Sequence, residues 1–339
     1  MLQRISPPVQ INRQNKAWRN ALADAVRDPL TLCRALDLAP EALQLSSTAA
    51  KQFPLRVPWE FIRRMRRGDP NDPLLRQVLP IAPEESLAPG FIADPVGDGE
   101  ATVASGILRK YRGRALLMTS PACAIHCRYC FRRHFPYAEH SGIQRDWPDA
   151  LAPIVADPSI DEVILSGGDP LSLPDNQLSP LIDALDAIPH LRRLRIHSRY
   201  PIVIPQRVDD ALGAWLERTR LTTVMVIHCN HPNEIDQQVR AALTRLRTMN
   251  VSLLNQAVLL GGVNDDADTL VRLSESLMDS GVLPYYLHML DRVAGAAHFE
   301  VDDAKALALV DTVRQRLPGY LVPKLVRETT GQPYKTPLT

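Results

Sequence analysis

From residue 114 onward the chain alternates short apolar strands with amphipathic helices, and this alternation restricts the possible folds more than any other feature. The expected strands are 115–119, 162–166, 194–197, 223–228, 252–255 and 285–289, and the expected helices are 147–156, 176–188, 209–218, 234–249, 266–280 and 302–316. Strands and helices that alternate at this spacing form parallel βαβ units with right-handed crossovers. Six units are too few to close an eight-stranded barrel, so we expect an α/β fold, a partial (β/α)6 TIM-like barrel.

The first expected strand leads into a loop with three cysteines in eight residues, Cys123, Cys127 and Cys130. This spacing matches the cluster loop of radical S-adenosylmethionine (SAM) enzymes, in which three thiolates bind a [4Fe–4S] cluster and the fourth iron binds SAM. Thiolates are soft ligands that suit such clusters. Zinc usually requires a fourth Cys or His at its own spacing, and a disulfide suits an oxidising compartment. We therefore expect a [4Fe–4S] cluster on these thiols, within a radical SAM barrel.

The other expected strands also end in polar residues, which predicts one polar pocket at the carboxyl-terminal rim of the barrel, above an apolar interior. Glycines let backbone approach a ligand closely, so Gly167, Gly168 and Asp169 are expected to receive the SAM ammonium group. The alternative is an ordinary turn between strand and helix. Ser198 and Gln256 end two further strands and are expected to contact cofactor.

Residues 1–100 contain short helical pieces broken by proline and show no visible chemistry, so they are expected to form a helical cap or lid and a linker. Residues 101–300 are expected to form the barrel, and residues 301–339 a helix, a strand and a tail. In that tail Lys335 lies among glycine and proline, where a lysine is ordinarily exposed to solvent. A mobile segment can also carry such a lysine into a pocket to bond to pyridoxal 5′-phosphate (PLP). Lys324 is the competing lysine and is interpreted as structural.

The formal net charge of +1 gives no electrostatic case for nucleic acid or a membrane surface as a partner. No apolar run approaches the roughly 20 residues that a membrane span requires. The basic run 63–67 is interpreted as a solvated helix face. With reduced cysteines and no targeting segment, the chain is expected to be cytoplasmic.

Several longer motifs resemble those of the lysine 2,3-aminomutases, and most closely their short bacterial branch that acts in modifying elongation factor P. The resemblance runs from about residue 15 to the C-terminus. It is carried by 123–136 (CAIHCRYCFRRHFP), 166–170 (SGGDP), 194–201 (LRIHSRYP), 254–265 (LNQAVLLGGVND), 284–299 (PYYLHMLDRVAGAAHF) and 320–338.

The resemblance implies three cofactors: a [4Fe–4S] cluster, SAM and PLP. Lys335 lies in the family's Lys-Thr-Pro motif, which implies that PLP bonds to this lysine. Tyr111 and Arg114 match positions that hold the PLP phosphate, a dianion that suits the geometry of arginine.

The resemblance also implies how lysine is held. Arg132 matches the arginine that pairs with the substrate α-carboxylate, and Asp291 matches a carboxylate for the ε-ammonium group. The second carboxylate of the family is usually aspartate, whereas Glu328 stands here. The sequence also ends three residues after Thr336, without the zinc-binding extension of the free-lysine catabolic enzymes. Both departures favour the elongation-factor branch.

The function that the resemblance implies is an isomerase, an L-lysine 2,3-aminomutase that supplies β-lysine for elongation factor P. Its expected partners are L-lysine, a one-electron reductant such as flavodoxin or a ferredoxin-like protein, and a separate ligase that attaches the product. One alternative is an aminomutase for another amino acid such as glutamate, which would require a cation at Asp291. Another is a scaffold that binds a partner protein without catalysis, which would need neither the three thiols nor Lys335.

Overall fold

The computed structural model describes residues 11–104, 106–137 and 147–339. Residues 1–10 of the expected segment 1–100, and residues 105 and 138–146 of the expected segment 101–300, lie outside that description. Within the described residues ten strands form one sheet, in which each strand pairs with its neighbour in the chain. The strands are β1 (Thr102–Ala104), β2 (Ile107–Leu108), β3 (Arg114–Ser120), β4 (Glu162–Gly167), β5 (Arg193–Ser198), β6 (Thr222–Ile227), β7 (Ser252–Val258), β8 (Leu283–His288), β9 (Lys324–Arg327) and β10 (Thr336–Pro337).

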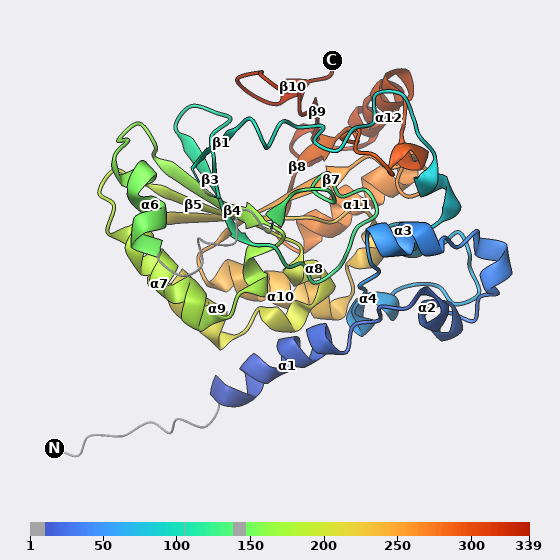
Figure 1. Ribbon diagram of the computed structural model, residues 1–339, viewed down its shortest axis with the longest axis horizontal. Helices are drawn as coiled ribbons and strands as arrows, with labels where there is room; N and C mark the ends of the chain where they lie inside the picture. The colour runs from blue at the N-terminus through green and yellow to red at the C-terminus, as the bar shows by residue number, and fades with distance from the viewer. Residues whose placement is uncertain (1–10, 105, 138–146) are drawn as a thin grey trace.

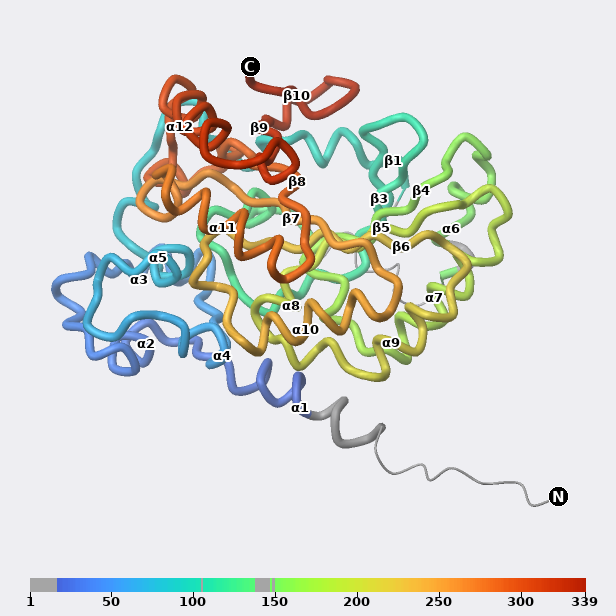
Figure 2. Tube along the Cα trace, turned by 180° about the vertical axis from the view of Figure 1, so that it is seen from behind, coloured from blue at the N-terminus to red at the C-terminus, as the bar shows by residue number. Residues whose placement is uncertain are grey.

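The strands from β3 to β9 pair in parallel, and β1, β2 and β10 are antiparallel strands at the two edges. Because each crossover leads to the next strand in the same direction, the helices lie on one face of the sheet and the sheet curves around its other face. Figures 1 and 2 show these helices as an arc outside the strands. The partial barrel is confirmed, and β9 extends the parallel run of six expected strands by one.

The helices of the arc are α6 (Trp147–Val155), α7 (Asp175–Asp186), α9 (Asp210–Leu216), α10 (Gln237–Thr248), α11 (Ala267–Asp279) and α12 (Asp303–Arg316). Four of them begin directly after an aspartate whose carboxylate accepts a hydrogen bond from a backbone amide of the first turn, at 2.8–2.9 Å. This N-cap satisfies an amide that has no partner within the helix. The capping residues are Asp209, Asp236, Asp266 and Asp302.

Side chains alternate along the strands, and the two faces differ in polarity. Outward residues such as Leu117, Leu165 and Ile196 are fully buried in the core beneath the helices. Inward residues include Arg195 and His197, which line a cavity inside the barrel. The expectation of an apolar interior below a polar rim is only partly right. Leu116, Ile164 and Val258 do line the cavity, but polar side chains such as Arg195 also extend along the inner face of the open barrel.

The N-terminal helices are α1 (Ile11–Ala23), α2 (Pro29–Ala35), α3 (Ser47–Gln52), α4 (Trp59–Ile62) and α5 (Pro73–Arg76). They share the core of the barrel. Trp18 in α1 is 2% exposed, packs edge-on against Tyr200 at 6.0 Å and lies under the guanidinium of Arg207. Tyr200 opens α8 (Tyr200–Val203), which follows β5 directly. The helical segment thus packs against the connections that leave the strands. Among the described residues no helix is both long and apolar enough to span a membrane.

Candidate active site

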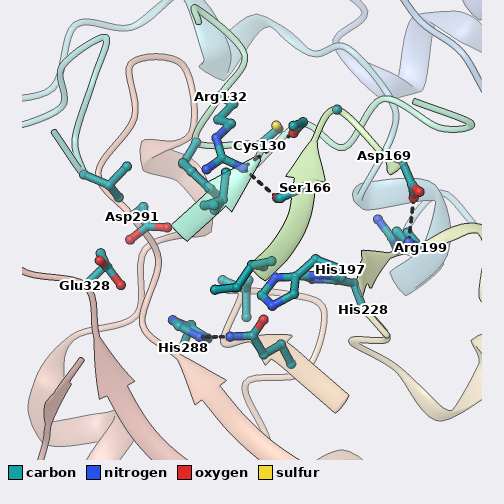
Figure 3. A pocket seen from close by; sticks show the side chains of 18 of the residues that line it. Cys130, Arg132, Ser166, Asp169, His197, Arg199, His228, His288, Asp291 and Glu328 are labelled. Carbon is teal, nitrogen blue, oxygen red and sulfur yellow. Dashed lines mark hydrogen bonds between the residues drawn. The ribbon is translucent and has the colours of Figure 1, made fainter. Parts of the chain in front are cut away.

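One cavity of about 360 Å³ opens inside the barrel. All fourteen residues predicted to form the site line it, although they come from sequence positions as far apart as 111 and 335. They are Tyr111, Arg114, Cys123, Cys127, Cys130, Arg132, Gly167, Gly168, Asp169, Ser198, Gln256, Asp291, Glu328 and Lys335. In Figure 3 Asp291 and Glu328 lie on one side of this cavity, and Asp169 and Arg199 lie on the other.

The cysteine loop follows β3 and is held in place by the N-terminal segment. Arg56 donates from Nη1 to the carbonyl oxygen of Cys123 at 3.1 Å, and its own carbonyl accepts the amide of His126 at 3.0 Å. Arg128, which is completely buried, pairs with the buried Glu84 at 2.5 Å. The expectation that no chemistry lies before residue 100 is therefore too narrow, because the loop conformation depends on these residues. Phe53 also lines the cavity.

The three thiols of the loop have the chemistry of an iron–sulfur site. All five cysteines of the chain are free, so no disulfide competes for them. Burial raises the pKa of Cys123 far above its usual range, and the neighbouring Cys130 raises it further. Burial, with Cys127, likewise raises the pKa of Cys130 to about 11. The positive charge of iron would offset both effects.

The arrangement of the cysteines also fits a cluster. Within residues 11–104, 106–137 and 147–339, no three His, Cys, Asp or Glu side chains converge as a single metal ion would require. A [4Fe–4S] cluster requires no such convergence, because each thiolate binds a different iron and the cluster itself spaces the sulfurs. The three residues therefore fit this group.

Gly167, the last residue of β4, and Gly168 are required by the close approach of the segment that leads into the cysteine loop. A Cβ atom on Gly168 would lie 2.6 Å from the carbonyl oxygen of Ala122, and one on Gly167 would lie 2.7 Å from that of Ser120. These close approaches allow the amide of Gly168 to donate to Ser120 at 2.6 Å. In the structure the glycines make room for the backbone that leads to the thiols; they also line the cavity, and their contact with SAM stays a prediction.

Asp169 is buried and braces the turns after β4 and β5. Its Oδ1 accepts from the amide of Leu171 at 3.0 Å and from the hydroxyl of Ser198 at 2.8 Å. Its Oδ2 accepts from the amide of Arg199 at 2.7 Å. Burial still raises the pKa of Asp169 to about 6, against the effect of these donors. The residue thus lines the cavity and also fixes the loop that carries Ser198.

Arg132, just past the last cysteine, is oriented by acceptors on two sides. Its Nε pairs with Asp98 at 2.6 Å, and its Nη1 donates to the hydroxyl of Ser166 at 3.1 Å (Figure 3). Lys110 also pairs with Asp98 at 2.6 Å. Burial raises the pKa of Asp98, but the two cations outweigh it and hold the pKa below its usual range. Asp98 therefore stays ionised and holds the guanidinium at the cavity wall.

Lys335 and Glu328 face each other across the base of a hairpin. Glu328 follows β9 and Lys335 precedes β10, and the antiparallel pairing of these strands brings Lys335 Nζ to 2.6 Å from Glu328 Oε2. The hydroxyl of Tyr111 donates to Glu328 Oε1 at 2.6 Å. Burial raises the pKa of Glu328, yet Lys335 and Tyr111 outweigh it, and the net pKa lies below its usual range.

Asp291 is a further carboxylate of the cavity, and among the described residues its side chain forms no ion pair or hydrogen bond comparable to those of Asp98, Asp169 and Glu328. Burial raises its pKa to about 7; the positive charge of Lys335 offsets part of this effect and Glu328 adds to it. An enclosed carboxyl whose pKa lies near neutrality is typical of a functional site. A bound cation beside Asp291 would favour the ionised carboxylate and lower that pKa.

Three imidazoles also line the cavity, and their lowered pKa values keep them neutral. Burial lowers the pKa of His228 to about 4, and burial with Arg195 lowers the pKa of His197 well below its usual range. His288 is affected in the same way, by burial and then Lys335, and its Nε2 lies 2.9 Å from the Nε2 of Gln256. These neutral rings supply hydrogen-bonding groups without adding positive charge.

The wall between these imidazoles and the hairpin fits PLP. Tyr111 lies beneath the guanidinium of Arg114, whose Cζ is 4.9 Å from the ring centre. Among the described residues no carboxylate forms an ion pair with Arg114, so its donors are available to a phosphate dianion. Lys335 supplies the amine that an aldehyde requires. The residues present therefore fit both the phosphate and the aldehyde of PLP.

Other cavity residues had not been singled out from the sequence. Asp98 lies in the segment expected to be a linker, Lys110 lies just before the first expected strand, and Tyr285 and Tyr286 were expected only as part of a strand. A partial signal existed for Asp98, an acidic residue between two glycines in an otherwise extended connection. Its partner Arg132 is 34 positions away, so their pairing is visible only in three dimensions.

No protein-family model matches the chain, whereas individual proteins do. L-lysine 2,3-aminomutase of Escherichia coli (strain K12) is 52% identical over 322 residues, which cover 95% of this chain and 94% of that protein. L-lysine 2,3-aminomutase of Haemophilus influenzae is 50% identical over 333 residues, which cover 98% of each chain. A solved structure described as native anSMEcpe with bound AdoMet and Kp18Cys peptide has a TM-score of 0.44 and 11% identity, covering 58% of this chain and 57% of that one.

Proposed function

This chain belongs to the L-lysine 2,3-aminomutase family, and we propose that it is an isomerase that moves the α-amino group of L-lysine to C3, giving β-lysine. The observation that carries the proposal is the meeting of the three thiols, Arg132, Asp291 and Lys335 on one cavity. A cluster site, an anchor for each end of lysine and an amine for an aldehyde cofactor are all needed for this reaction.

The proposed cofactors are a [4Fe–4S] cluster, SAM and PLP. When bound, the cluster with SAM supplies a carbon-centred radical and PLP supplies a system that delocalises an unpaired electron. The cysteines would hold the cluster; Gly167, Gly168, Asp169 and Ser198, which adjoin the cysteine loop, would hold SAM; and Tyr111, Arg114, Gln256 and Lys335 would hold PLP.

Substrate recognition is proposed to use charges at both ends of lysine. Arg132 presents Nη2, which has no partner among the described residues, to the α-carboxylate. Asp291 pairs with the ε-ammonium group. When the amine of Lys335 releases Glu328 Oε2, that oxygen becomes available as the second contact to the ammonium. Anchoring both ends fixes C3 relative to the cofactors.

Exclusion of water is supported by a contact between two segments that carry cavity residues. A Cβ atom on Gly97 would lie 2.8 Å from Cγ2 of Thr330, so the loop that carries Asp98 touches the hairpin that carries Lys335. Asp98 and Glu328, which lie close to the two contacting residues in the chain, both line the cavity that would hold lysine. A closed site is required because a reactive radical would otherwise be quenched.

The wider setting follows from the same proposal. A flavodoxin or ferredoxin-like protein would donate the single electron, and a separate ligase would attach β-lysine to elongation factor P. The motif match to the elongation-factor branch supports this role. Five free cysteines support a reducing compartment, and we place the activity in the cytoplasm.

The test is anaerobic reconstitution with iron and sulfide, followed by incubation with SAM, PLP, dithionite and either L-lysine or L-glutamate. β-Lysine is the expected product, with no turnover of glutamate, because Asp291 and Glu328 repel a second carboxylate. Turnover of glutamate alone would select an aminomutase of different specificity. Absence of SAM cleavage in protein that carries the cluster would leave only a binding scaffold.

A further inference from the structure

Arg199 is the first residue after β5, and its guanidinium reaches the cysteine loop. Nη1 lies 2.7 Å from Sγ of Cys127 and 2.7 Å from the hydroxyl of Tyr129. Nη2 donates to Oε1 of Gln77 at 2.7 Å and pairs with Oε2 of Glu234 at 3.0 Å. Each terminal nitrogen is thus held by two acceptors, and the residue is 7% exposed.

The acceptors around Arg199 come from separate parts of the chain and are themselves fixed. Gln77 follows α5 and Glu234 lies between β6 and α10. Asn230 donates from Nδ2 to Gln77 at 3.1 Å and to Tyr129 at 2.7 Å, and Gln77 donates to Glu234 at 3.1 Å. This closed network leaves the guanidinium little freedom to turn away from Cys127, so its position is built into the fold.

We propose that Arg199 sets the reduction potential of the cluster by directing a charged N–H donor at the Cys127 thiolate. This inference rests on the proposed function, since it needs a cluster on the three cysteines. Reduction adds one electron, taken from an external one-electron reductant, to a cluster that already carries negative thiolates. Hydrogen bonds to the sulfurs and nearby positive charge stabilise that added charge. Arg199 therefore raises the potential and makes the cluster easier to reduce.

Glu234 opposes this effect in a predictable direction. Its carboxylate pairs with the far side of the guanidinium and offsets part of the charge that Cys127 experiences. Removal of the carboxylate leaves the arginine charge uncompensated. The structure thus predicts that removing Arg199 lowers the reduction potential and that removing the charge of its partner Glu234 raises it. A general loss of stability would not shift the potential in opposite directions.

The experiment is a potentiometric titration of the full-length, anaerobically reconstituted chain without SAM, followed by electron paramagnetic resonance of the reduced cluster. At the wild-type midpoint, Arg199→Met is expected to lower the ratio of reduced to oxidised cluster about tenfold, which is 59 mV for one electron. Arg199→Lys keeps the positive charge but loses the two-pronged guanidinium. Its midpoint potential is expected to lie between those of the wild type and Arg199→Met. Glu234→Gln is expected to raise the ratio.

Arg207→Met is the matched control, because Arg207 is also fully buried and paired with a carboxylate, Asp175, at 2.8 Å. It is expected to leave the midpoint unchanged. The inference would be overturned if Arg199→Met changed the ratio of reduced to oxidised cluster by less than twofold, or if Glu234→Gln lowered that ratio. If Arg199→Met binds no iron, the inference is judged on Glu234→Gln alone: a higher midpoint potential supports it and a lower one refutes it. Failure of the wild-type chain to bind a cluster would instead refute the proposed function.

Discussion

Asp291→Asn tests how the cavity recognises the far end of lysine. The variant keeps the shape of the side chain but removes the charge that would pair with the ε-ammonium group. A charged hydrogen bond contributes about 1.5–3 kcal/mol, so KM for L-lysine should rise roughly 10- to 150-fold at pH 8. Asp311→Asn, on the exposed face of α12, is the matched control and should leave KM unchanged.

The pH dependence gives a sharper form of the same prediction. The pKa of Asp291 is raised to about 7 by burial, so the wild-type carboxyl is largely protonated below that pH and cannot pair with an ammonium group. Relative to high pH, lysine binding should weaken about twofold at pH 7 and about elevenfold at pH 6. This pH dependence of lysine binding is expected to disappear in Asp291→Asn, because an amide does not titrate.

The assay is initial-rate formation of β-lysine from pH 6 to pH 8, with KM and kcat determined separately. Cluster content is measured at each pH, so that loss of iron is not mistaken for weak binding. The reasoning is refuted by a wild-type KM that stays constant across this range, or by an Asn variant with the same slope as the wild type.

The remaining predictions concern the cofactor amine, the cysteine loop and the core. Lys335→Ala should lose the absorbance of PLP bonded to the protein and keep that of the cluster; the exposed Lys324→Ala should lose neither, and the reverse pattern would exchange their roles. Gly168→Ala should lower the free energy of unfolding by about 1–3 kcal/mol and reduce the iron bound per chain, because the new Cβ would clash with backbone atoms. Its control is Gly319→Ala, where the new Cβ would meet no atom within 4 Å and the free energy of unfolding should change by less than about 0.5 kcal/mol. Trp18→Ala should lower the free energy of unfolding by about 3–5 kcal/mol in one denaturant transition, and two separate transitions would contradict a shared core.

Local patterns in the sequence determined the elements and the chemistry that they carry. Strand-like runs of four to six residues identified β3 to β8, and helical periodicity identified the segments between them. The cysteine spacing indicated a cluster without reference to any distant residue. These features are readable because their physical cause, the periodic placement of side chains along a strand or a helix, acts within a few residues.

Only the tertiary structure decided which groups meet and in what state. The approach of β9 and β10 places Lys335 against Glu328, and the network around Arg199 joins positions 77, 127, 129 and 234. Asp98 reaches Arg132 from a segment with no recognisable motif. Such pairings depend on how the barrel closes around its cavity, and the raised pKa of Asp291 depends on burial that no local pattern records.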